Sequence, residues 1–211
     1  CQAGVDRSES EYVLFLNDDT APLAKDWLTR MLAQAERPGV GAVGALLYYP
    51  DGRIQHAGVL VGTPNGAGHP GRLTNGTPAW PWLEMTREQS AVTGACLLMR
   101  REIYESHKGF DPIFPVNYND VDLCLRVRQS GLSVLLEASA KLTHFESTTR
   151  KTGIRYQERQ LFLERWAKVI EAGDEYFNPN LTDNELLLPD PECFVTRASL
   201  KRLALSAKER S

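Results

Sequence analysis

The amino-acid sequence predicts an α/β fold, and three observations support this class. Short continuous apolar runs, such as residues 12–16, are typical of strands buried within a parallel sheet. Segments with apolar residues at helical spacing alternate with these runs, most clearly at 119–130 and 156–170. With 211 residues, of which 42% are hydrophobic, the chain is large enough for one substantial core that needs no disulfide or structural metal.

Turn residues and apolar runs define the elements of the first half of the chain. The first strand is predicted to be buried on both faces and to end at a polar turn, and Asp26 is predicted to cap the helix that follows. The many Gly and Pro residues of 62–87 predict a long loop. Strands are predicted at 12–16, 40–49, 54–61 and 91–100, and helices at 27–36 and 101–107.

The clearest helix of the second half is predicted at 119–130. Asn119 is a good N-cap, and Asp120 and Asp122 lie in the first turn, where the helix dipole favours anions. Gly131 is a natural residue to end this helix. Strands at 132–136 and 140–145 and a helix at 156–170 are predicted to follow.

Charge and cysteine content exclude several classes of protein. The formal net charge of -3 gives no general attraction to nucleic acid or to an anionic membrane, and no apolar run approaches the roughly 18 residues of a membrane-spanning helix. The cysteines form no CxxC pair and no short Cys/His spacing that suits zinc. Cys96 and Cys124 lie in apolar runs, which favours buried free thiols and a reducing, cytoplasmic location.

The end of the chain differs from the rest in charge. Residues 197–211 contain five Lys and Arg against one Glu. Such a tail could contact the inner face of a membrane or a phosphate-rich partner, and the alternative is a solvated terminus. We therefore expect a domain at 1–185 and a tail or linker at 186–211.

Two neighbouring carboxylates follow the first predicted strand. Successive strand residues point to opposite faces, so Asp18 and Asp19 can contact two neighbouring parts of one ligand rather than a single point. Ligands of open α/β sheets bind at the carboxyl ends of strands, and carboxylates bind the divalent cations that accompany diphosphates. The alternative is a simple strand-ending turn, in which Asn and Asp are common.

A second pair of carboxylates opens the helix at 119–130. Asp120 and Asp122 point roughly 200° apart on a helix, so at most one of them faces a given site. Arg126 stands four residues after Asp122 and predicts an ion pair, which leaves Asp120 as the candidate general base. The alternative is that both carboxylates only stabilise the helix start.

Three histidines are candidates for a polar site. His144 ends an apolar strand, and His56 and His69 stand in or near the predicted loop. A single histidine at a strand end is more often structural than a ligand, so none of the three identifies a site alone.

Taken in order, five motifs resemble glycosyltransferase family 2, and more narrowly the bacterial O-antigen and rhamnosyl-type transferases. The resemblance covers roughly residues 11–185. It implies the GT-A-like fold, with a mixed sheet flanked by helices. The motifs are FLNDDT, DGRIQHAGV, SAVTGACLLMRR, GFDPIFPVNYNDVDLCLR and LTHFES.

The resemblance implies a role for each matching residue on the donor side. Asp19 would coordinate a cation, Mn²⁺ or Mg²⁺, that bridges the diphosphate of a nucleotide-sugar donor, and Asp18 would lie near the ribose. His144 would complete the metal shell, and a mixed carboxylate and imidazole shell suits Mn²⁺ better than Mg²⁺. Gly94 and Ala95 would line the donor-sugar and acceptor pocket.

The resemblance also implies the reaction. Asp120 would be the general base that deprotonates a hydroxyl of a glycan or lipid-linked acceptor, and Asn119 stands where the family usually has Glu. One base opposite one leaving group implies a single displacement with inversion at the anomeric carbon. The family's first strands, which hold the nucleotide base, have no counterpart before Tyr12, so we expect the nucleotide-binding half to be truncated.

Two other functions remain open at this stage. The chain could be a glycan- or partner-binding module that keeps the fold without catalysis, which the incomplete N-terminal half favours. A metal-dependent phosphohydrolase is a third possibility, which the absence of a dense His/Asp cluster disfavours. The sheet edge left by the missing strands also predicts pairing with a second copy of the chain.

Overall fold

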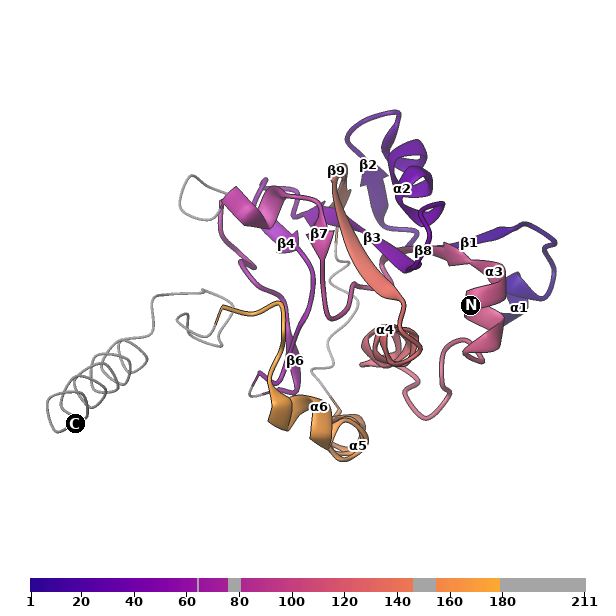
Figure 1. The fold of residues 1–211 in the computed structure, drawn as a ribbon. Coiled ribbons are helices and arrows are strands. Elements are labelled where there is room, and N and C mark those ends of the chain that lie inside the picture. The colour runs from indigo at the N-terminus through magenta and orange to yellow at the C-terminus, as the bar shows by residue number, and fades with distance from the viewer. Residues whose placement is uncertain (64, 76–80, 146–154, 179–211) are drawn as a thin grey trace, which may run out of the picture.

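The computed structural model describes residues 1–63, 65–75, 81–145 and 155–178 (Figure 1). The predicted tail at 186–211 lies outside these ranges. The helical elements are α1 (Gln2–Val5), α2 (Trp27–Ala35), η1 (Pro81–Glu84), α3 (Arg101–Ser106), α4 (Asn119–Gln129), α5 (Tyr156–Arg165) and α6 (Ala167–Ala172). The strands are β1 (Tyr12–Leu16), β2 (Thr20–Pro22), β3 (Val40–Tyr48), β4 (Ile54–His56), β5 (Leu60–Val61), β6 (Ala67–Gly68), β7 (Arg87–Glu88), β8 (Cys96–Arg100) and β9 (Ser133–His144).

A mixed seven-stranded sheet forms the centre of the molecule, as predicted. Its strand order is β1-β8-β3-β9-β2, with β4 added to β3 and β7 added to β9. β8 runs antiparallel to both β1 and β3, whereas β3 and β9 are parallel. β1, β3 and β9 therefore all run in one direction, and their carboxyl ends lie at the same edge of the sheet.

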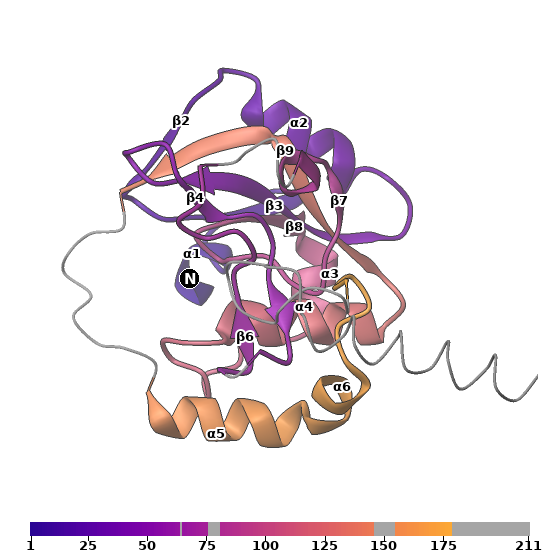
Figure 2. The same cartoon turned by 90° about the vertical axis from the view of Figure 1, so that its left-hand side faces the viewer.

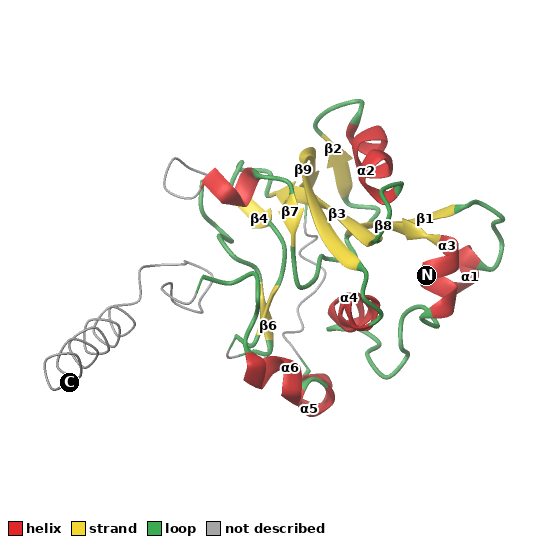
Figure 3. Ribbon diagram, viewed as in Figure 1, coloured by secondary structure: helices red, strands yellow, loops and turns green. Residues whose placement is uncertain are grey.

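Helices cover both faces of this sheet (Figures 2 and 3). α2 packs Met31 and Ala35 against Val43 and Leu98 on one face. α4 packs its apolar residues, among them Val127, against the opposite face, where α5 and α6 form an outer layer. Among the described residues, no helix combines the length and apolar character that crossing a membrane requires.

The first strand differs from its prediction. Among the described strands, β1 lies at the edge of the sheet and runs antiparallel to its neighbour β8. Its burial alternates, with Val13 and Phe15 buried and Tyr12 and Leu14 half-buried, so it is not buried on both faces. An apolar run alone does not distinguish a central strand from an edge strand whose outer face is only partly covered.

Several element boundaries also differ from their predictions. The predicted strand at 54–61 is interrupted at Gly58, whose φ of +95° a strand does not accommodate. The two strands predicted between 132 and 145 are one continuous strand, β9. Its pairing with β3 shifts register between Ala45 and Leu46, so the extra residues form a bulge within β9. The predicted loop at 62–87 contains β6 and η1 and runs into β7, and the helix predicted at 156–170 is divided at Trp166.

Two residues predicted to cap helices through their side chains do not do so. Asn119 is the first residue of α4, and the N-cap is Tyr118, which has the left-handed φ of +63°. Asp26 occupies the N-cap of α2 without capping it, because its carboxylate pairs with Arg30 at 2.7 Å. The thiols of Cys96 and Cys124 are buried as predicted, and burial raises the pKa of each to about 12.

Candidate active site

The candidate site lies where the parallel strands of the sheet end. β1 leads into the turn that holds Asp18 and Asp19, and β9 ends at His144. β2 pairs antiparallel with β9, and its first residue, Thr20, lies directly opposite His144. β8 runs the other way and begins at this edge, so the segment just before it, residues 93–95, also lies here.

Asp19 and His144 contact each other across these strand ends. Asp19 Oδ1 lies 3.0 Å from His144 Nε2, and both side chains are mostly enclosed. Gln55 of β4, a residue that the sequence patterns did not single out, contacts the other ring nitrogen, with Oε1 2.6 Å from Nδ1. Asp18 is exposed on the same turn, so the two carboxylates have different surroundings.

The orientations of the Asn17 and Gln55 amides assign the ring proton of His144 to Nδ1. Asn17 Nδ2 can only donate, so His144 Nε2 at 3.2 Å accepts from it, and Nδ1–H donates to Gln55. In this tautomer the lone pair of Nε2 faces the carboxylate oxygen of Asp19. A lone pair of Nε2 that faces a carboxylate oxygen at 3.0 Å is a suitable place for a positive charge, such as a bound cation.

The donor set of Asp19 and His144 therefore fits a divalent cation. The Gln55 contact is the kind of outer contact that orients a metal-ligating imidazole. Within the described ranges, no group of three or more His, Cys, Asp or Glu residues could hold a metal. A cation at this pair would need further ligands, and substrate phosphates and water commonly supply them.

Asp120 lies at the start of α4 and is held by the protein backbone. Its Oδ2 accepts the N–H of Gly94 at 2.7 Å, and its Oδ1 accepts the N–H of Val121 at 2.9 Å. Gly94 lies directly against this carboxylate, and an added Cβ would be in van der Waals contact with the Cβ of Asp120 at 3.4 Å. Backbone donors cannot rotate away as side chains can, so they hold the carboxylate in one direction.

Asp122 has a different environment from Asp120, as the helical geometry predicted. Its side chain is completely buried and pairs with Arg126 at 2.8 Å and with Arg165 at 3.0 Å. Trp166 Nε1 donates to the same carboxylate at 3.1 Å. Asp122 therefore connects α4 to the layer of α5 and α6, and it has a structural role.

The segment 93–95 connects the two carboxylate positions. The carbonyl of Ala95 accepts the N–H of Asn17 at 2.9 Å, just before Asp18 and Asp19. The adjacent Gly94 binds Asp120, as described above. The structure thus brings the predicted residues of both motifs to one segment, although Asp18 itself is placed only by its position in the turn.

Two of the predicted histidines, the buried His56 and the half-buried His69, form a pair beside this segment. His56 Nδ1 lies 3.0 Å from His69 Nδ1, and His56 Nε2 lies 3.3 Å from the backbone nitrogen of Thr93. Burial, together with the nearby charges of His69, Arg87 and His144, holds the pKa of His56 well below its usual value. Two adjacent polar residues, Gln55 and His56, inside an otherwise apolar strand were the available sequence signal for this cluster.

Arg87 is the other polar residue near this cluster that the sequence patterns did not identify. Its guanidinium donates to the carbonyls of Ala57, Leu83 and Met85 and stacks on the Trp82 ring, with 5.0 Å from Cζ to the ring centroid. Burial lowers its pKa to about 10. These contacts make it a structural link between loops.

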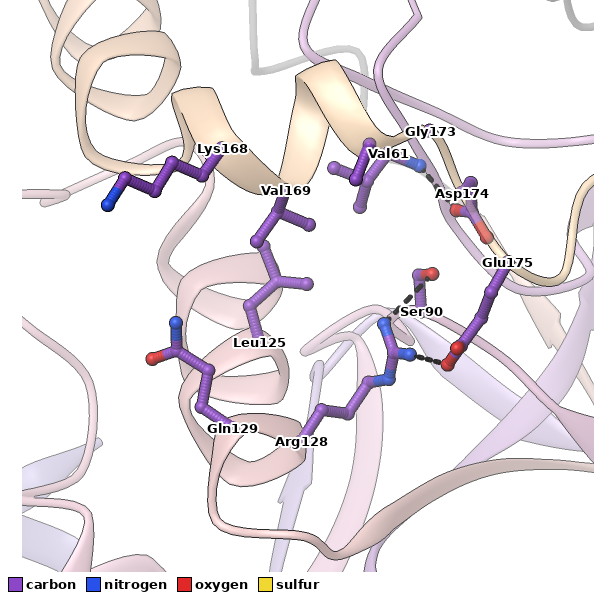
Figure 4. A pocket seen from close by; sticks show the side chains of 11 residues that line it. Val61, Ser90, Leu125, Arg128, Gln129, Lys168, Val169, Gly173, Asp174 and Glu175 are labelled. Carbon is purple, nitrogen blue, oxygen red and sulfur yellow. Dashed lines mark hydrogen bonds and ion pairs between the residues drawn. The ribbon is translucent and has the colours of Figure 1, made fainter.

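A separate cavity of about 340 Å³ lies between the second half of α4 and α6 (Figure 4). Val61, Leu125 and Val169 form apolar parts of its wall, and Arg128 and Glu175 pair at its rim. Asp19, Asp120 and His144 do not line it, and neither do Gln55 and Gly94, which contact them. The cavity is therefore distinct from the candidate active site.

Comparison with known sequences gives relatives that are longer than this chain. It is 40% identical over 207 residues to an uncharacterized protein of Sinorhizobium fredii, covering 92% of this chain and 23% of the relative. It is 42% identical over 182 residues to the O-antigen biosynthesis protein RfbC of Myxococcus xanthus, covering 83% of this chain and 14% of the relative. It is 27% identical over 132 residues to the N-acetylglucosaminyl-diphospho-decaprenol L-rhamnosyltransferase of Mycobacterium tuberculosis, covering 54% and 40%. No family model matches the chain.

Solved structures share the fold at low sequence identity. GalNAc-T7, crystallised with UDP, GalNAc and Mn²⁺, matches 81% of this chain and 34% of its own with a TM-score of 0.60 and 12% identity. The mannosyltransferase PcManGT from Pyrobaculum calidifontis, solved with GDP-Man and Mn²⁺, matches 82% and 43% with a TM-score of 0.52 and 16% identity. Both are glycosyltransferases of the GT-A fold. The chain therefore has the GT-A fold, and its sequence is similar to segments of an O-antigen biosynthesis protein and of a rhamnosyltransferase.

Proposed function

We propose that the protein transfers a sugar, with inversion and with a divalent cation, from a nucleotide-diphosphate donor to a glycan or lipid-linked acceptor in cell-surface polysaccharide synthesis. The observation that carries this proposal is the pair of facing acceptors, Asp19 Oδ1 and His144 Nε2, 3.0 Å apart. A cation bound at these strand ends would attract the negatively charged diphosphate of a nucleotide-sugar donor. The O-antigen and rhamnosyltransferase names of the relatives support the class of product.

Asp19 and His144 would hold the cation, Mn²⁺ or Mg²⁺. Bound there, the cation would neutralise the charge that develops on the leaving diphosphate. Gln55 keeps the ring of His144 oriented toward Asp19. The exposed Asp18 would contact the ribose, and Gly94 and Ala95 would line the pocket for the donor sugar and the acceptor.

Asp120 would act as the general base. Its carboxylate accepts two backbone N–H groups at the start of a helix, which hold its oxygens in one direction. As the acceptor oxygen bonds to the anomeric carbon and the bond to the diphosphate breaks, Asp120 takes the hydroxyl proton. A single displacement of this kind inverts the anomeric centre.

Three further proposals concern the rest of the nucleotide site, the location of the protein and its oligomeric state. The chain spans less than a quarter of the Sinorhizobium and Myxococcus relatives, so we propose that the remainder of the nucleotide site belongs to other parts of a longer protein. A cytoplasmic location, with peripheral contact at the inner face of the membrane, would suit a lipid-linked acceptor. Pairing of two copies through the edge strand β1 stays a prediction.

Calorimetry tests the donor and cation proposal on the full-length protein. UDP-, GDP- and dTDP-sugars would be titrated with and without Mn²⁺, and we expect heat of binding for one of them only with Mn²⁺. Asp19→Asn should abolish that dependence. Asp26→Asn makes the same chemical change at an exposed ion pair on α2 and should leave it intact.

Two outcomes would contradict the proposal. Donor binding that is equal with and without Mn²⁺ would exclude the cation from the donor site. Glycan binding without turnover of any donor would favour the alternative, a binding module that retains the fold.

A further inference from the structure

A buried histidine lies one hydrogen bond away from the segment that holds the proposed base. His56, on β4, has 1% of its surface exposed and makes hydrogen bonds through both ring nitrogens. Nε2 lies 3.3 Å from the backbone nitrogen of Thr93, and Nδ1 lies 3.0 Å from Nδ1 of His69. Burial and nearby charges hold its pKa well below the usual value, which favours the neutral ring.

These partners determine the direction of every hydrogen bond in the series. A backbone N–H can only donate, so Nε2 of His56 must accept from Thr93. A neutral imidazole that accepts at Nε2 carries its proton on Nδ1, and that proton is donated to His69. Nδ1 of His69 is then an acceptor.

The same segment contacts Asp120. Gly94 follows Thr93 and donates its N–H to Asp120 Oδ2 at 2.7 Å. Thr93 Oγ1 accepts the N–H of Ala95 at 3.3 Å, which closes a tight turn around Gly94. Two successive N–H groups are therefore held by two different side chains, that of Thr93 by His56 and that of Gly94 by Asp120.

We propose that His56 is a positioning residue for this base: it anchors the N–H of Thr93, and the anchored segment presents the N–H of Gly94 to Asp120. His69 assists by keeping His56 in the tautomer that accepts from Thr93. This inference rests on the proposed function, because it assigns His56 a task in the chemistry of Asp120. A purely structural histidine would fill the same space without controlling the direction of the Gly94 N–H.

Two amide substitutions separate these roles. The amide oxygen of Gln reaches about as far from the backbone as Nε2 of histidine, so His56→Gln can still accept from Thr93. The amide of Asn reaches only as far as Nδ1, so His56→Asn keeps a partner for His69 and leaves the N–H of Thr93 without its acceptor. Both variants replace the imidazole by an amide, which makes them a matched pair.

The first readout is kinetic. We expect His56→Asn to lower kcat on the order of tenfold or more, since small displacements of a catalytic group have large effects on rate. Donor affinity should fall much less than kcat, because Asp19 and His144 are unchanged and only the nearby Gly94 and Ala95 shift. His56→Gln should stay within about threefold of the parent in both quantities. Equal losses of kcat in the two variants would overturn the proposal.

The second readout does not depend on activity. The amide proton of Gly94, which donates to a carboxylate at 2.7 Å, should resonate far downfield in the NMR spectrum of the parent chain. We expect this resonance to move upfield in His56→Asn and to stay in place in His56→Gln. An unchanged resonance in a folded His56→Asn would refute the positioning role, even if the protein proved to have no transferase activity.

A third variant covers the case in which His56→Asn does not fold. His69→Leu changes a half-buried residue and removes the acceptor that selects the tautomer of His56. It should shift the Gly94 amide proton in the same direction by a smaller amount. No shift in this variant would contradict the part assigned to His69.

Discussion

The two proposed working carboxylates, Asp19 and Asp120, are held in opposite ways. Asp19 lies on a strand-end turn beside exposed residues, and its contact to His144 joins two side chains from distant parts of the chain. Asp120 opens a helix and accepts two backbone N–H groups. Asp19 can give up its contact to His144 when a ligand binds, whereas the backbone donors hold the carboxylate of Asp120 in one direction.

The difference matches the tasks proposed for the two groups. A carboxylate that binds a cation must open its contacts to admit the ion and its phosphates. A general base gains from a fixed orientation, because proton transfer depends on the position of the accepting oxygen. The contrast can therefore be tested by changing each side separately.

The largest expected effect is that substitution of Asp120 lowers the rate of transfer, whereas substitution of Asp19 weakens donor binding. Asp120→Asn should lower kcat by roughly 10²- to 10⁴-fold with donor affinity unchanged, because it removes the base and leaves the cation site. Asp19→Asn should instead weaken Mn²⁺-dependent donor binding. Calorimetry and a transfer assay on the same two variants measure both quantities. Turnover that survives in Asp120→Asn would assign the base to another residue.

The next effect distinguishes the two carboxylates of α4. Asp122→Asn should lower the free energy of unfolding by about 3 kcal/mol, because it breaks a buried ion pair with Arg126 and Arg165. Asp120→Asn is the matched control and should change stability much less, since its side chain is only half-buried. Urea denaturation of both variants measures the difference. Equal destabilisation would show that Asp120 is chiefly a structural residue.

A smaller effect is expected from the outer contact of the cation pair. Gln55→Leu removes the acceptor for Nδ1–H of His144 and should weaken Mn²⁺ affinity by about 10- to 100-fold. Gln55→Glu retains an acceptor at the same place and should keep or improve the affinity. Titration with Mn²⁺, followed by the paramagnetic resonance signal of free Mn²⁺, compares the variants. Identical affinities would mean that Gln55 does not orient the ring.

The smallest effect concerns pH. Because the pKa of His56 is lowered in the folded protein, the unfolded chain binds a proton first as pH falls. The stability associated with neutral His56 is fully present above about pH 6.5 and is lost below it, by up to about 1.4 kcal/mol per pH unit. His56→Gln removes this group, so its stability should fall less steeply between pH 6.5 and 5. Parallel slopes for parent and variant would contradict a neutral, buried His56.

Much of the local structure could be predicted from the sequence. The positions of β1, β3, α2 and α4 follow from apolar runs and helical spacing, which are properties of short segments. The separate roles of Asp120 and Asp122 followed from the angle between them on a helix and from the spacing of Asp122 and Arg126. These inferences needed no knowledge of which segments lie side by side.

The tertiary structure alone decided how these segments meet. The edge position of β1, the left-handed Tyr118 before α4, and the single long β9 depend on neighbouring strands and packed helices. The contacts of Gln55 with His144 and of His56 with Thr93 join residues far apart in the chain. Periodicity records which face of an element is apolar, but the partners of a polar side chain are set by long-range packing. For this protein, the sequence therefore determined the chemistry of the candidate groups, and the tertiary structure determined their arrangement.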